Sequence, residues 1–218
     1  MELICAEETA GKGSFEELLP KARTGDRIVF VEGGVDNMEW RWHPRGFMIR
    51  HGDHILLSNG ETLFVGEWGN WEGHDEGFVI EQGDKLLLNG RQVIYQGKWT
   101  CWHSHPEGVA VERDGQILLN SQVLFEGSFW NDWDVHRQGI VFDQDLKLVV
   151  NSVEICQLGF KDIWTTHPMG VAVGRGLRVL LNDRQVIFDG IFSSLHPHKY
   201  GIVVEHGDRL ELIVHKEA

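Results

Sequence analysis

The residues best suited to chemistry are six histidines that recur at a fixed spacing of 31 residues. They are His43, His74, His105, His136, His167 and His198. A ring of imidazoles could bind a transition metal or titrate between about pH 5 and 8. His103-x-His105 and His196-x-His198 would each place two imidazoles on one face of an extended segment. No carboxylate or cysteine recurs at the same spacing to complete a site, so we expect no metal and no cofactor. We expect each motif histidine to bond a backbone carbonyl instead.

Each histidine belongs to a Trp-x-x-His-x-x-Gly motif, in which Leu195 replaces the sixth tryptophan. The five motif tryptophans are Trp40, Trp71, Trp102, Trp133 and Trp164. An aromatic residue present in every repeat serves what every repeat needs, so we expect these side chains to pack between repeats. Trp68, Trp99 and Trp130 form a second, less regular set. These three are candidate binding residues, because a lectin-like protein could stack sugars on such aromatic platforms.

Three acidic residues, Asp132, Asp134 and Asp162, lie off the repeat pattern near Trp133 and Trp164 and are further candidate binding residues. The sequence contains no Gly-x-Ser-x-Gly, no phosphate-binding glycine loop and no His-Glu-x-x-His. We therefore expect no enzymatic activity and assign no catalytic residue.

The period itself indicates a repeat architecture. Its anchors are Gly46, Gly77, Gly108, Gly139, Gly170 and Gly201. In the second repeat, apolar runs at 77–81, 85–88 and 93–96 are separated by Gln-Gly-Asp and Asn-Gly turns. Asn-Gly and Asp-Gly between apolar runs are strong hairpin signals, so the strands should be antiparallel.

Two architectures stack such units, a closed β-propeller and a right-handed parallel β-helix. Runs such as Val109–Val111 and Leu86–Leu88 are continuously apolar, which is typical of sheets covered on both faces. The last repeat also lacks its final strand, and residues 26–32 supply a spare one. We therefore predict an all-β, six-bladed propeller spanning residues 25–218, with the N-terminal strand completing the last blade. The β-helix remains the alternative, because asparagines at 89, 120, 151 and 182 could stack as a ladder.

Residues 1–24 do not fit the period and should form an N-terminal extension. Residues 3–6 are expected to form a short strand, and Ser14 with Glu17 gives a capping-box pattern for a short helix. Three antiparallel strands end on the side of a blade opposite to where the next must begin. We therefore expect residues 98–102 and their equivalents to form a fourth, outer strand or a crossing segment, with residues 102–108 spanning the blade.

Turns such as that in Val111–Leu119, together with the blade pattern, resemble shortened repeats of WD- or NHL-type propellers over residues 40–218. This resemblance implies the architecture and transfers no functional residue. Residues 14–35, a short helix followed by Gly-Asp-Arg-Ile-Val-Phe-Val-Glu-Gly-Gly, resemble the N-terminal cap of pectin-lyase-like β-helix proteins. That second resemblance favours the alternative fold and, with it, an enzyme acting on polysaccharide.

The net charge of −13 argues against nucleic acid or an anionic membrane as a partner. Three cysteines, Cys5, Cys101 and Cys156, do not suggest a disulfide framework, and no signal peptide is visible. We therefore expect a cytoplasmic protein. The predicted function is a non-enzymatic scaffold that presents a propeller face to another protein, possible partners including basic ones, as in an adaptor or an immunity protein. A carbohydrate-binding module is the first alternative function.

Overall fold

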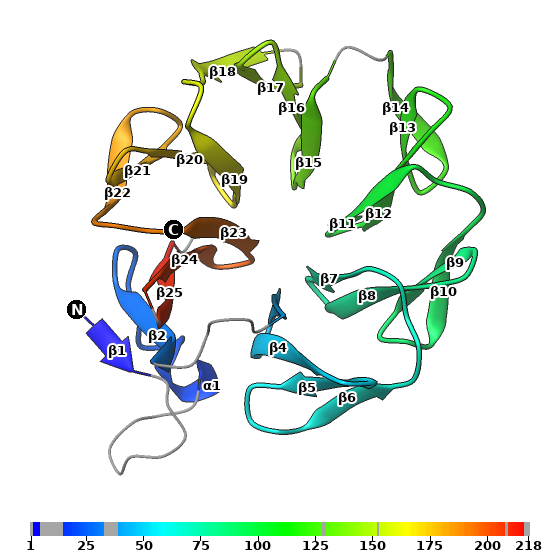
Figure 1. Cartoon of the computed structure of the whole chain (residues 1–218), viewed down its shortest axis with the longest axis horizontal. Helices are drawn as coiled ribbons and strands as arrows, with labels where there is room; N and C mark the ends of the chain where they lie inside the picture. Colours follow the sequence, from blue (N-terminus) through cyan, green and yellow to red (C-terminus); the bar gives the residue numbers. More distant parts are fainter. Residues whose placement is uncertain are drawn as a thin grey trace. The chain divides into compact units, whose positions relative to one another are not determined.

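The computed structural model describes residues 2–4, 15–32, 39–127, 130–151, 153–207 and 209–215, which form six small sheets (Figure 1). Each sheet is one blade of a six-bladed β-propeller, so the predicted fold class is confirmed. The β-helix alternative is wrong, because strands that follow each other within a repeat pair antiparallel. In the part of the chain that the structure describes, no helix is long and apolar enough to cross a membrane.

The chain divides into two compact units of three blades each. The first three blades lie in Glu39–Asn131. Their strands are β3 (Trp40–His43), β4 (Gly46–His51), β5 (His54–Leu57) and β6 (Thr62–Val65); β7 (Trp71–His74), β8 (Gly77–Gln82), β9 (Lys85–Leu88) and β10 (Gln92–Gln96); and β11 (Cys101–His105), β12 (Gly108–Arg113), β13 (Gln116–Leu119) and β14 (Gln122–Glu126).

The last three blades lie in the unit made of Met1–Met38 and Asp132–Ala218. Their strands are β15 (Asp132–His136), β16 (Gly139–Gln144), β17 (Lys147–Val150) and β18 (Val153–Gln157); β19 (Ile163–His167), β20 (Gly170–Arg175), β21 (Arg178–Leu181) and β22 (Gln185–Asp189); and β23 (Ser194–His198), β24 (Gly201–His206), β25 (Arg209–Val214), β2 (Arg27–Glu32) and β1 (Glu2–Ile4).

The sixth blade is built from both ends of the chain, as predicted. Strand β2 pairs antiparallel with β25 and takes the place that a fourth strand has in the other blades. It also carries a register shift between Val29 and Val31, and every other blade has a shift between its third and fourth strands. Strand β1 pairs in parallel with β2, and helix α1 (Phe15–Leu18) lies between these two strands in the sequence. The expected strand residues 5–6 and the capping Ser14 lie outside the described residues.

The Trp-x-x-His-x-x-Gly motif is a tight hairpin. In blade 3, His105 pairs with Gly108, so the chain reverses over only two residues, Pro106 and Glu107. The prediction for residues 98–102 was therefore partly wrong. Residues 98–100 do cross between blades, but the extra strand that begins at Cys101 is the innermost one. First strands of neighbouring blades contact each other within each unit (β3 with β7, β7 with β11, β15 with β19, β19 with β23), so the first strand of a blade is its innermost one.

The motif glycine has no room for a side chain. Gly108 has a φ of 144°, in the region that favours glycine, and a Cβ there would collide with the Asn120 side-chain oxygen. Asn120 itself has a φ of 49° in the turn between β13 and β14, and its amide donates a hydrogen bond of 2.7 Å to the Glu107 carbonyl. The asparagines at 89, 120, 151 and 182 therefore clamp the motif hairpins of blades 2 to 5 to the turn between the third and fourth strands of the same blade.

Candidate functional site

The six motif histidines are buried and belong to the framework of the blades. In blade 3, His105 Nδ1 accepts a hydrogen bond of 3.0 Å from the Glu107 N–H, two residues further on. The other five histidines accept the equivalent N–H, from Arg45, Glu76, Gln138, Met169 and Tyr200. The Nδ1 atom accepts a backbone N–H that the two-residue turn leaves pointing inward, a contact that we did not expect; the expected bond to a carbonyl would be donated by Nε2, which carries the ring proton. The imidazole therefore stabilises the turn in its neutral form.

Burial keeps part of this histidine set uncharged. Burial lowers the pKa of His167 to about 3, and the neighbouring His215 and His136 act in the same direction. The rings of His167 and His215 meet edge to face, with centroids 4.9 Å apart. Burial likewise lowers the pKa of His136, although the backbone of Pro168 and His167 in the next blade acts in the opposite direction. His167 therefore remains neutral between about pH 5 and 8.

The second histidine of each His-x-His pair uses one ring nitrogen within its own hairpin. His105 and His198 use Nδ1 to accept backbone N–H groups. Among the described residues, no three His, Cys, Asp or Glu side chains are placed to hold a metal ion.

Three motif tryptophans, Trp71, Trp102 and Trp164, pack between neighbouring blades. Trp40, Trp71, Trp102 and Trp133 are buried, and Trp164 is partly buried. Trp102, 2 % exposed, packs against Val79, Leu86 and Tyr95 of blade 2 and Val109, Val111 and Leu118 of its own blade. Its indole N–H donates a hydrogen bond of 3.1 Å to Glu81. Leu195 occupies the equivalent place between blades 5 and 6. Burial leaves these four indoles without an open ring face to bind a ligand.

The second tryptophan set is half-buried in the segments that link successive blades. Trp68, Trp99 and Trp130 meet Phe64, Tyr95 and Phe125 of the preceding fourth strand edge to face. The Arg50 guanidinium lies over the Trp68 ring, 5.2 Å from its centroid. Phe192 makes the same contact with Phe188 in blade 5. In blade 4 the position on the fourth strand that holds this aromatic partner in blades 1, 2, 3 and 5 is occupied by the small Cys156. Phe160, in the link that follows, is 93 % exposed.

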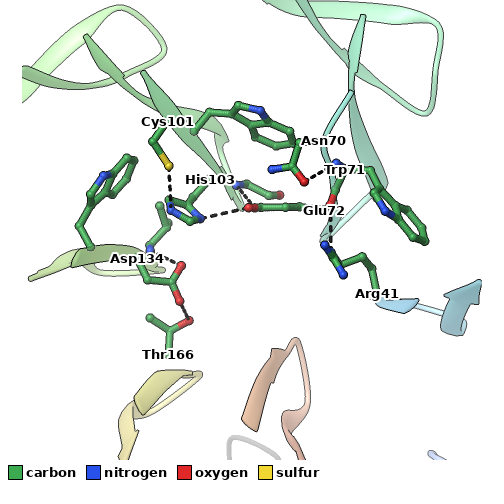
Figure 2. Close-up of polar contacts among 12 residues, drawn as sticks. Arg41, Asn70, Trp71, Glu72, Cys101, His103, Asp134 and Thr166 are labelled. Atoms are coloured by element: carbon green, nitrogen blue, oxygen red, sulfur yellow. Dashed lines mark hydrogen bonds and ion pairs between the residues drawn. The ribbon is translucent and has the colours of Figure 1, made fainter. Parts of the chain in front are cut away.

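The three aspartates bind different groups. Asp132 accepts a hydrogen bond from the Trp133 N–H, and Asp162 accepts from the Gly159 N–H and from Arg175. Asp134 accepts from the Val135 N–H and, across to the next blade, from the Thr166 hydroxyl at 3.0 Å (Figure 2). The structure places all three in local or inter-blade bonds and does not gather them into one acidic site.

Sequence reasoning named His103, Asp134 and His196 but missed that they share one repeat position, directly after the motif tryptophan or Leu195. This position holds Arg41, Glu72, His103, Asp134, Thr165 and His196. The residue type differs between repeats but is always polar, and an alignment of the repeats at the 31-residue spacing would have shown this. Arg41 Nε donates to the Trp71 carbonyl of the next blade at 3.1 Å (Figure 2). Glu72 accepts a hydrogen bond of 2.7 Å from the Ser104 N–H of the next blade. At several blades this position therefore ties neighbouring innermost strands together.

In blade 3 this position also contacts a thiol. His103 Nδ1 lies 3.1 Å from Glu72 Oε1, and His103 Nε2 lies 3.6 Å from Cys101 Sγ (Figure 2). Cys101 is partly exposed, and His103 and Glu72 are each 23 % exposed. Cys101 entered the predictions from the sequence only through the disulfide count. The thiol is connected to Glu72 through His103, and Glu72 belongs to another blade, so local sequence patterns do not reveal the connection.

Blade 6 carries related residues in a different arrangement. Ser194 Oγ lies 2.8 Å from His196 Nε2 and donates a hydrogen bond of 2.7 Å to Glu205 of the second strand of the same blade. Glu205 lies 3.8 Å from His196 Nε2, so this carboxylate is on the hydroxyl side of the ring.

The chain matches no family model, and no curated protein or solved structure matches it. Any functional proposal therefore rests on the geometry alone.

Proposed function

We propose that the protein is a non-enzymatic binding scaffold whose partner is a basic protein. The observation that carries this proposal is a group of exposed apolar side chains on blades 4 and 5. They are Leu146, Phe160, Ile163, Leu177 and Ile191. Phe160 and Ile191 are 93 % and 77 % exposed. Large exposed apolar residues are typical of protein-interaction surfaces, where aromatic side chains contribute much of the binding energy.

The topology places these five residues at one end of their blades. In an antiparallel four-stranded blade, the turn between the second and third strands lies at the same end as the link to the next blade. Leu146 and Leu177 belong to such turns, and Phe160 and Ile191 belong to links. Ile163 begins β19, directly after the link. We call this end of blades 4 and 5 the apolar link end.

The charge of the chain favours a basic partner. There are 33 acidic residues against 20 basic ones, and opposite charge increases the rate of association and its specificity. The repeated histidines and most of the motif tryptophans serve the framework, so the side chains left to contact a partner are those that differ between blades.

A matched pair of variants tests this proposal. Phe160→Ser with Ile191→Ser alters the apolar link end, whereas Val65→Ser with Val93→Ser alters apolar residues, 54 % and 47 % exposed, on the fourth strands of blades 1 and 2. Each protein is cross-linked in extract of the native host, and the captured partner is purified and titrated. We expect the first variant alone to lose a basic partner, whose affinity falls at least about tenfold between about 50 and 500 mM salt. Capture unaffected by the first variant, or binding insensitive to salt, would overturn the proposal.

Carbohydrate binding is the alternative function, and it can be tested with the same purified protein. Burial of four motif indoles leaves Trp68, Trp99 and Trp130 as the main candidate platforms, and each is packed edge to face on a neighbour. Titration of the protein with mono- and oligosaccharides, followed by tryptophan fluorescence, should give no change in emission. A saturable change that disappears in Trp99→Ala would favour the lectin-like function.

A further inference from the structure

Three side chains in blades 2 and 3 form a continuous hydrogen-bonded row. It runs from Cys101 Sγ to His103 Nε2 at 3.6 Å, and from His103 Nδ1 to Glu72 Oε1 at 3.1 Å (Figure 2). The other carboxylate oxygen of Glu72 accepts the Ser104 N–H at 2.7 Å. The two ring nitrogens of His103 therefore face chemically different partners, a carboxylate and a thiol.

The direction of these bonds follows from the groups involved. An ionised carboxylate only accepts hydrogen bonds, so the proton of His103 is held at Nδ1. Nε2 then presents its lone pair to the Cys101 thiol and can accept the thiol proton. A nucleophile beside a base that is oriented by a third group is the usual arrangement for activating a side chain. Glu72 is fixed in turn by the Ser104 backbone, so the imidazole is oriented through both blades.

Two further features bear on the thiol. Cys101 is partly exposed, so small molecules can reach it, whereas Cys156 is buried and burial raises the pKa of its thiol to about 11. Glu112 of β12 is the cross-strand partner of Cys101. Glu72 on β7 and His103 on β11 are the other charged or titratable groups of this row, and His103 Nε2 is the one in contact with Cys101 Sγ.

We propose that Cys101 is a reactive thiol, activated by His103 and Glu72, that small hydroperoxides oxidise to a sulfenic acid. His103 Nε2 takes the thiol proton, and the thiolate attacks one peroxide oxygen. The O–O bond breaks as the S–O bond forms, and the leaving hydroxide takes the proton from the imidazolium as water. With hydrogen peroxide, one thiol and one peroxide give one sulfenic acid and one water, with sulfur oxidised by two electrons. This modification does not depend on the binding function proposed above.

The test uses the full chain with hydrogen peroxide as the oxidant. Sulfenic acid is trapped with dimedone and located by mass spectrometry, with Cys156 as a control in the same sample. We expect Cys101 to be labelled at least about tenfold faster than Cys156. His103→Gln should slow the labelling of Cys101 at least about tenfold, whereas His196→Gln, at the same repeat position in blade 6, should leave it unchanged.

A pH profile separates activation from a structural effect. The rate of Cys101 alkylation by iodoacetamide should rise with pH at a lower midpoint in wild type than in His103→Gln. Glu72→Gln preserves the shape of the side chain and removes its charge, and it should also raise the midpoint. If circular dichroism shows that His103→Gln is not folded, Glu72→Gln serves as the test in its place. Equal rates for Cys101 and Cys156, or midpoints unchanged in the folded variants, would overturn the proposal.

Discussion

The first strands of blades 3 and 6 carry related residues at the same two repeat positions, yet they build different sites. Strand β11 has Cys101 and His103, and β23 has Ser194 and His196. In both strands the first side chain contacts Nε2 of the second. The carboxylates differ in origin. Glu72 reaches His103 Nδ1 from the preceding blade, whereas Glu205 reaches the Ser194 hydroxyl from the same blade.

The difference shows that the neighbouring blade decides what a strand can do. The position that holds Glu72 before blade 3 holds Thr165 before blade 6, and Thr165 is a short, buried side chain. A carboxylate on Nδ1 orients the imidazole and raises its basicity. A carboxylate on the nucleophile side competes with the ring for the hydroxyl proton. The framework of the two strands is shared, and the chemistry depends on one residue in the adjacent repeat.

The largest expected effect concerns the buried motif position that holds Trp102 in blade 3 and Leu195 in blade 6. Trp102→Ala should lower the free energy of unfolding by about 3–5 kcal/mol, because this buried indole fills the space between blades 2 and 3. Trp102→Leu copies the residue of β23 and should cost clearly less. Urea unfolding followed by circular dichroism measures both. A loss below about 1 kcal/mol for the alanine variant would show that the indole is dispensable for packing.

The buried motif histidine, common to both strands, predicts a pH dependence that is best tested at His167. Burial, with His215 and His136, lowers its pKa to about 3, compared with about 6.5 in an unfolded chain. Its contribution to stability is complete above about pH 6.5. As the pH falls further, the unfolded chain binds a proton that the folded chain excludes. The loss approaches about 1.4 kcal/mol per pH unit, or about 2 kcal/mol by pH 5.

Urea midpoints at pH 7 and pH 5 measure this loss. His167→Gln should be less stable at pH 7, but it should lose less stability than wild type between the two pH values. Identical losses in the two proteins would contradict the assignment of this pH dependence to His167.

The next prediction concerns a thiol placed on β23 at the position that Cys101 has on β11. Ser194→Cys puts a thiol beside His196, but Glu205 lies on the thiol side of the ring and disfavours the thiolate. The introduced thiol should react with iodoacetamide at least about tenfold more slowly than Cys101 near pH 7. Mass spectrometry resolves the two sites in one sample. Equal reactivity would mean that the origin of the carboxylate does not matter.

The smallest effect concerns how the motif hairpin is held. Asn120 clamps the hairpin of blade 3, whereas in blade 6 the backbone of Ile213 lies against Gly201 in that place. Asn120→Ala should cost about 1 kcal/mol, one exposed hydrogen bond together with an unfavourable positive φ. Asn120→Gly should cost less, because glycine tolerates that φ. Thermal unfolding compares the two, and an alanine variant as stable as wild type would show that the clamp contributes nothing.

Much of the fold was predictable because it rests on local rules. The 31-residue period marks the repeats, Asn-Gly turns mark hairpins, and continuous apolar runs mark strands buried on both faces. The spare strand near the N-terminus predicted how the sixth blade is completed. The innermost position of the motif strand was missed, because periodicity gives the length of a hairpin but not which of its strands neighbouring blades contact.

The candidate site was less predictable. The sequence marked the motif histidines and tryptophans as framework, but it did not predict that the histidine Nδ1 accepts a backbone N–H, because that contact depends on the geometry of a two-residue turn. Phe160 is exposed in the link of the one blade among the first five whose fourth strand holds Cys156 in place of an aromatic residue, and the sequence did not mark this difference.

The sequence by itself determined the repeat, the antiparallel hairpins and the residues that pack them, since each depends on neighbours within one repeat. Only the tertiary structure decided which side chains meet across blades. Cys101, His103 and Glu72 join because stacking brings adjacent innermost strands into contact, and no spacing within a single repeat records that contact.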